Sequence, residues 1–128
     1  MNAHGLKRAI TELITFLRPT NSTHWIDTLS RIHSKLGDPT IAQIARRDLE
    51  SCFGGMGSLN DLYFCEQNGN LPPGTDTKAF NAEFSRLMDT LFRENRLAGA
   101  SLFQRLRWRY YEFKHRGELA PRIKKTFA

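Results

Sequence analysis

The sequence predicts an all-α fold, arranged as a single compact domain of about five to six helices over residues 1–128, with a glycine-rich turn in the middle. Two observations support this fold class. Apolar residues recur every three or four positions along most of the chain, which is the spacing of one face of a helix. The composition, 40% hydrophobic and 25% charged, is that of a globular chain of ordinary domain size.

Three helices are predicted between residues 4 and 50. The first ends near Arg18-Pro19, where proline stops the periodic pattern. Its buried face is Leu6, Ile10, Leu13, Ile14 and Leu17. The second has Trp25, Leu29, Ile32 and Leu36 on one face. Gly37 follows it and is expected to end it through a left-handed turn.

Asp38-Pro39 is expected to start the third helix, as a cap followed by proline at the first helical position. The predicted buried residues of that helix are Ile41, Ile44, Ala45 and Leu49. The next long helix follows the loop at residues 68–75, with Thr75 or Asp76 as its cap. Its apolar face is Phe80, Phe84, Leu87, Met88 and Leu91.

The end of the chain is predicted to be a basic helix and tail over residues 101–128. Gly99 either separates it from the preceding helix or lies within one long helix, and both readings fit the pattern. The apolar face of this last helix is Leu102, Phe103, Leu106, Tyr110 and Phe113. Gly117 is expected to end it.

The segment from Phe53 to Asp61, FGGMGSLND, is the one stretch that looks like a motif. A phosphate-binding loop needs a lysine followed by serine or threonine after its last glycine, and a dinucleotide fingerprint needs a preceding strand and GxGxxG spacing. The segment has neither, so a structural role is favoured. Gly54, Gly55 and Gly57 are expected to allow positive φ and close approach of neighbouring helices.

Ser58 and Asp61 have the spacing of a capping box, which predicts a short helix from Leu59. The strand-like propensities of the residues that follow favour instead a brief extended segment near 62–65. Asn60 and Asp61 are candidate binding groups, because polar side chains at a rigid turn are often used in recognition.

No pattern of catalytic or metal-binding residues occurs. The four histidines and two cysteines lack the spacing of a metal site, and the cysteines are expected to be free thiols in a reducing compartment. The first 19 residues are amphipathic and resemble neither a signal peptide nor a membrane span. We therefore expect a cytoplasmic protein that is not an enzyme, has no metal or other cofactor and does not associate with a membrane.

The positive charge is concentrated at one end of the chain. Residues 93–128 hold 10 Lys/Arg and 3 Asp/Glu, whereas residues 1–92 hold 9 and 10, within a net charge of +6 for the whole chain. Arginine and aromatic side chains presented together are typical of protein interfaces. The predicted partner-binding residues on the last helix are Arg105, Trp108, Arg109 and Tyr111.

FGGMGSLND followed by Leu62 resembles a group of small, uncharacterised bacterial domains that share a GGMGSLND-type motif and helical flanks. The resemblance covers residues 40–100 and implies no assigned activity. More loosely, the chain resembles the immunity proteins of contact-dependent inhibition and other polymorphic toxin systems, which bind and neutralise a cognate toxin protein. The charge of +6 departs from the acidic balance expected of an inhibitor that plugs a nuclease active site. It is compatible with an acidic toxin surface or with binding away from the active site.

The leading functional prediction is thus an immunity-type protein that binds a toxin domain without catalysis. The alternative is a nucleic-acid-binding module that uses the basic last helix and tail, with affinity that falls steeply as salt rises. A third hypothesis, a small hydrolase with Asp61 in its site, rests on that carboxylate and neighbouring histidines alone.

Overall fold

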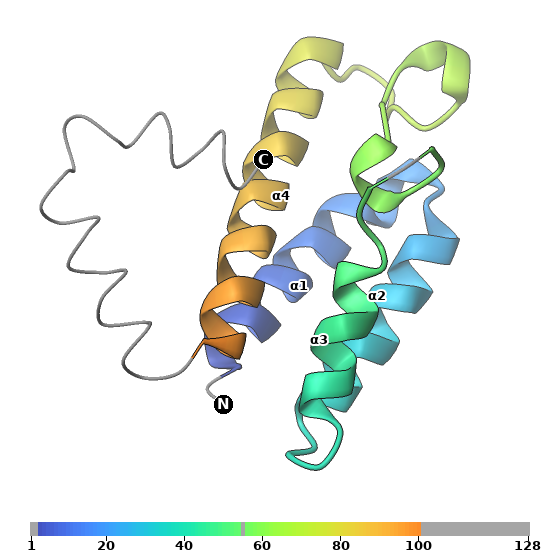
Figure 1. Ribbon diagram of the computed structural model, residues 1–128. Coiled ribbons are helices and arrows are strands. Elements are labelled where there is room, and N and C mark those ends of the chain that lie inside the picture. The colour runs from blue at the N-terminus through green and yellow to red at the C-terminus, as the bar shows by residue number, and fades with distance from the viewer. Residues whose placement is uncertain (1–2, 55, 101–128) are drawn as a thin grey trace, which may run out of the picture.

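A computed structural model describes residues 3–54 and 56–100 (Figure 1). This part contains four α-helices, α1 (His4–Leu17), α2 (Thr23–Leu36), α3 (Ala42–Glu50) and α4 (Thr77–Gly99). It also contains three single 3-10 turns, η1 (Arg18–Thr20), η2 (Leu59–Asp61) and η3 (Glu66–Asn68), and no strand. The all-α prediction is confirmed. The last predicted helix and tail, with Arg105, Trp108, Arg109 and Tyr111, lie outside the described residues, as does Gly55.

The described residues contain four α-helices, slightly fewer than the five to six predicted for the whole chain, of which the last lies outside the described residues. The short helix expected from Leu59 is a single 3-10 turn, and its next residue, Leu62, is already extended with ψ of 134°. α4 ends at Gly99, and the extended backbone of Ala100 follows it. Of the two readings of residues 97–100, the structure therefore shows the break.

α1 lies between the other helices and packs against α2 on one side and α4 on the other, while α3 packs on α2 and on α4 (Figure 1). The five residues of the predicted apolar face of α1 are all buried. Each helix thus contributes one apolar face to a shared core, as the periodicity predicts.

The turn between α2 and α3 differs from the prediction at both of its ends. Gly37 has φ of −74°, so α2 does not end in a left-handed turn; the amide of Gly37 bonds to the Ser34 carbonyl at 3.2 Å instead. The Asp38 carboxylate accepts from the amide and the hydroxyl of Thr40, at 2.9 and 2.7 Å. Asp38 therefore closes a turn, and α3 begins only at Ala42.

This later start also changes the buried face of α3. Ala42, Ala45 and Leu49 face the core, whereas Ile44 is 51% exposed. Because adjacent helical residues point about 100° apart, a helix this short buries Ala45 and leaves Ile44 at its edge.

α4 is fixed at both ends. Asp76 caps it, as predicted, by accepting the amide of Ala79 at 2.7 Å. Near the other end, Arg46 of α3 donates from Nε to the carbonyl oxygen of Asn95 at 2.9 Å and covers Gly99, where a Cβ atom would collide with the guanidinium group. This contact joins α3 to the last turns of α4.

Asn95 is the polar residue of α4 with the least solvent exposure, 3%, and its side-chain Oδ1 is buried without a hydrogen-bond partner among residues 3–54 and 56–100. Burying an amide without a partner costs about 1–3 kcal/mol. Asn95→Leu, which has a similar branched shape, is expected to raise the free energy of unfolding by about 1 kcal/mol. Urea denaturation would measure the change, and a loss of stability of similar size would contradict this account of the core.

Candidate functional site

The FGGMGSLND segment forms a loop that is closed by its own backbone. The amide of Leu59 donates to the carbonyl of Cys52 at 2.8 Å, and both side chains are buried. Gly54 and Gly57 have φ of 83° and 78°, which side chains of L-residues rarely adopt. A Cβ atom at either glycine would meet nothing within 4 Å. These two glycines therefore serve the backbone conformation, as predicted. The predicted close approach of neighbouring helices is wrong for both of them within the part of the chain that the structure describes.

The polar residues of the motif hold the loop in shape. Asn60 Oδ1 accepts from the amide of Gly54 at 3.0 Å and from the Ser58 hydroxyl at 2.6 Å. Asp61 Oδ2 accepts from the amide of Gly57 at 3.1 Å. The Ser58 side chain makes no capping hydrogen bond to η2, so its expected half of the capping box is not formed.

These hydrogen bonds argue against a phosphate-binding loop. Such a loop recognises phosphate through free backbone amides. Here the amides of Gly54 and Gly57 already bond to Asn60 and Asp61, and the Asp61 carboxylate lies where an anion would have to approach. The geometry agrees with the structural reading of the motif.

Aromatic packing anchors the loop on one side and leaves its tip exposed. Phe53 packs on Phe92 of α4, with ring centroids 4.1 Å apart. Met56, between the two turn glycines, is 99% exposed. The loop thus presents an apolar side chain to solvent from a backbone held by several bonds.

Residues 62–65 are extended but pair with no strand in the described chain. The Asn81 side chain of α4 takes the place of a strand: its Oδ1 accepts from the amide of Phe64 at 2.9 Å, and its Nδ2 donates to the carbonyl of Phe64 at 2.8 Å. The Phe64 ring is fully buried among Phe16, Phe80 and Phe84. Its neighbour Tyr63 consequently points the other way and is 56% exposed.

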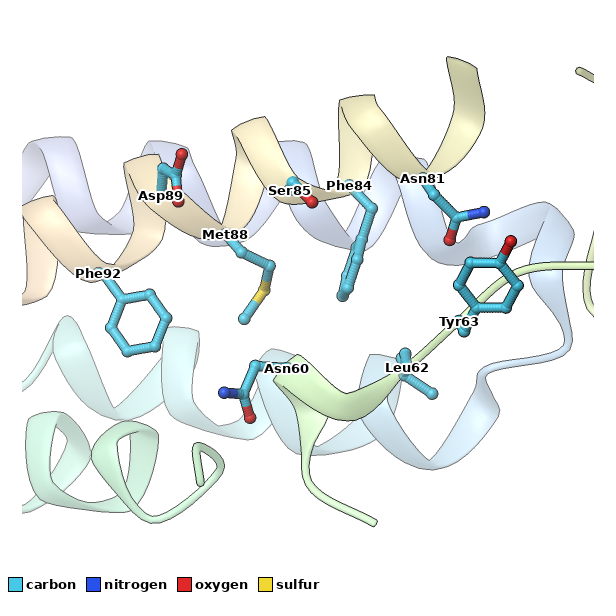
Figure 2. A pocket seen from close by; sticks show the side chains of 9 residues that line it. All are labelled: Asn60, Leu62, Tyr63, Asn81, Phe84, Ser85, Met88, Asp89 and Phe92. Atoms are coloured by element: carbon cyan, nitrogen blue, oxygen red, sulfur yellow. The ribbon is translucent and has the colours of Figure 1, made fainter. Parts of the chain in front are cut away.

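A pocket of about 330 Å³ lies where this segment passes α4 (Figure 2). Asn60, Leu62 and Tyr63, from the segment that connects α3 to α4, form one side of the pocket. The side of α4 is formed by Asn81, Phe84, Ser85, Met88, Asp89 and Phe92. The pocket is therefore mostly apolar in its walls and has polar groups among them.

The described residues offer little nucleophilic or metal chemistry. The pocket is lined by no histidine, cysteine, lysine or arginine, and no group of three His, Cys, Asp or Glu in residues 3–54 and 56–100 could hold a metal ion. Burial, and then the nearby Asp48 carboxylate, raises the pKa of the Cys52 thiol, which disfavours the reactive thiolate. The pocket is suited to binding by shape and hydrogen bonds.

The turn conformation of the motif gives a direct prediction. Gly57→Ala is expected to lower the free energy of unfolding by about 1–2 kcal/mol, because alanine is strained at positive φ. Gly57→Asn is expected to cost less, since asparagine tolerates the left-handed region. Denaturation curves of the two variants would test this, and equal costs for alanine and asparagine would contradict a role based on φ.

The sequence-based candidates and the pocket overlap in part. Asn60 lines the pocket, while Asp61 lies beside it and supports the loop. The pocket side of α4 and the exposed Tyr63 are not among the sequence-based candidates. The alternation of Leu62, Tyr63 and Phe64 in an extended segment was the one local signal for Tyr63, because it places successive side chains on opposite sides.

None of the described helices is long and apolar enough to cross a membrane. No curated protein and no solved structure shows a significant match to the chain. The model of one family, a domain of unknown function (DUF6966), matches residues 19–73. The match includes α2, α3, the glycine loop and the extended segment, and it ends before α4. It is consistent with the expected resemblance to an uncharacterised family of small domains.

Proposed function

We propose that the protein is an immunity-type protein of the cytoplasm that binds and neutralises a cognate toxin domain without catalysis. One observation supports this proposal above the others: two large apolar side chains, Met56 and Tyr63, are 99% and 56% exposed on a segment that is held by its own hydrogen bonds. Apolar side chains exposed on a backbone that is already held in one conformation can contact a partner at a low cost in ordering.

The fixed loop matters because binding costs entropy when flexible segments become ordered. A loop whose backbone is already closed between Cys52 and Leu59 avoids part of that cost. Methionine and tyrosine are also enriched at protein interfaces, because they bury much area on contact. The segment therefore has the properties of a preformed protein-binding surface.

The basic end of the chain has a separate role in this proposal. Arg105, Trp108, Arg109 and Tyr111 remain predicted contacts, and the positive charge of residues 93–128 would speed encounter with an acidic part of the toxin. Asn60 and Asp61 act mainly by holding the loop that presents Met56.

Co-expression with the product of the adjacent gene tests the proposal. We expect the full chain to co-purify with that product in a defined complex and to restore growth to cells that express it. If the chain stays monomeric in its presence and growth is not restored, the proposal is wrong.

The uneven charge keeps nucleic-acid binding as a second candidate, because 10 of the 19 Lys/Arg lie in residues 93–128. Such binding releases counterions, so its affinity must fall steeply as salt increases. Fluorescence anisotropy with labelled DNA and RNA at two salt concentrations would decide. An absence of binding at low salt would exclude this candidate.

A further inference from the structure

The segment that connects α3 to α4 is acidic, although the whole chain is basic. No lysine or arginine occurs between Arg47 and Lys78. The same stretch carries three exposed carboxylates in its loops, at Asp61, Glu66 and Asp76. The net charge of +6 therefore conceals a local region of negative charge.

This acidic segment forms one side of the pocket. Asp61 lies between the two lining residues Asn60 and Leu62, Glu66 follows Tyr63 by three residues, and Asp76 caps the helix that forms the other side. The α4 side adds the carboxylate of Asp89, and none of the described residues that line the pocket is basic. α4 also carries basic residues beside this stretch, Lys78, Arg86 and Arg93, of which Arg86 is paired with Glu83. The described acidic groups still outnumber the basic ones, so a cationic partner group is favoured over an anionic one.

The interior of the pocket suits an apolar side chain. Leu62, Phe84, Met88 and Phe92 supply carbon surface, and the volume of about 330 Å³ is at the lower end of the range for ligand pockets. Ser85 lies on the α4 side between Phe84 and Met88, as Figure 2 shows. A single aromatic or large aliphatic side chain has the size and polarity to occupy this space.

We propose that this pocket receives an apolar side chain of the partner protein, and that lysine or arginine residues flank that side chain on the partner. This inference rests on the proposed protein-binding function and names its site. The buried apolar group supplies affinity, as anchor residues in pockets do at other interfaces. The carboxylates of the connecting segment attract the flanking basic groups and disfavour acidic partners.

A displayed library of random peptides, selected on the immobilised full chain, tests the chemistry without knowledge of the partner. We expect enrichment of peptides with an aromatic or large aliphatic residue between lysines or arginines. Ser85→Trp, which fills the pocket, is expected to weaken binding of a selected peptide at least about tenfold, a change of about 1.4 kcal/mol. Ala79→Trp is the matched control, because Ala79 is exposed on the same helix and does not line the pocket. The Ala79→Trp variant should bind the selected peptide with the same affinity as the wild type.

The charge is tested separately with Glu66→Lys, since Glu66 is exposed and lies outside the pocket wall. This variant should bind the selected peptide more weakly than the wild type does, and the difference in affinity should shrink at high salt.

Enrichment of acidic peptides, absence of any enrichment, or equal binding by wild type and Ser85→Trp would overturn the inference. A toxin complex that persists with Ser85→Trp would remove the pocket assignment alone. Peptide binding without any complex with the adjacent gene product would remove the toxin function and leave the pocket in place.

Discussion

Phe64→Ala is expected to lower the free energy of unfolding by about 3–5 kcal/mol, the range for removing a fully buried phenylalanine ring. Phe64 has no solvent exposure, and its ring contacts Phe16, Phe80 and Phe84 at centroid distances of 5.8, 5.1 and 5.1 Å. It is the point where the extended segment inserts into the contact between α1 and α4. Removal of the ring leaves a cavity there and releases the segment that forms one wall of the pocket.

Urea denaturation followed by circular dichroism would measure this loss. Tyr63→Ala is the control, because the adjacent side chain is 56% exposed and its removal should change stability by about 0.5 kcal/mol or less. Equal losses for the two variants would show that the segment does not have the inward and outward alternation described above.

Asn81→Ala is expected to cost about 2–3 kcal/mol, because it leaves the amide and the carbonyl of Phe64 without their partners. The variant also loses the bond from Asn81 Nδ2 to the Thr77 carbonyl, at 2.8 Å, within α4. An asparagine side chain offers one acceptor and two donors, and all of these groups are used here. Few substitutions preserve that set, so Asn81→Asp should also destabilise, by placing a carboxylate against two carbonyl oxygens.

Asn68→Ala provides a matched control on the same segment. Asn68 and Asn70 both donate to the carbonyl of Tyr63, at 2.9 and 3.0 Å, so loss of one amide leaves the acceptor satisfied. We expect a change of about 1 kcal/mol or less for Asn68→Ala. A larger effect for Asn68→Ala than for Asn81→Ala, in the same denaturation assay, would contradict the role given to Asn81.

Local patterns were sufficient to predict the long helices. The apolar face of α1 is buried at every predicted position, and Asp76 caps α4 as its place before the periodic residues indicated. The turn after α2 was predicted less well, because Asp38 can either cap a helix or close a turn with Thr40. That choice depends on where α3 must start in order to bury Ala45 and Leu49, which is a tertiary requirement.

The candidate site was predictable only in its loop. The glycines and the polar residues after them indicated a turn, but the partners of Asn60 and Asp61 required the folded loop. The bond between Asn81 and Phe64 joins residues 17 positions apart, and no spacing rule gives it. The acidic residues of the segment between α3 and α4 do not show in the net charge of +6, because the Lys and Arg of residues 93–128 outweigh them.

The central claim is that the FGGMGSLND segment keeps its shape in the free protein, so that its exposed side chains form a preformed surface. Amide hydrogen exchange of the full chain, measured by NMR without any partner, tests this most directly. The amides of Gly54, Gly57 and Leu59 should exchange much more slowly than that of Met56, for which the described structure shows no hydrogen bond. Exchange of all four amides at the rate of an unstructured chain would contradict the claim.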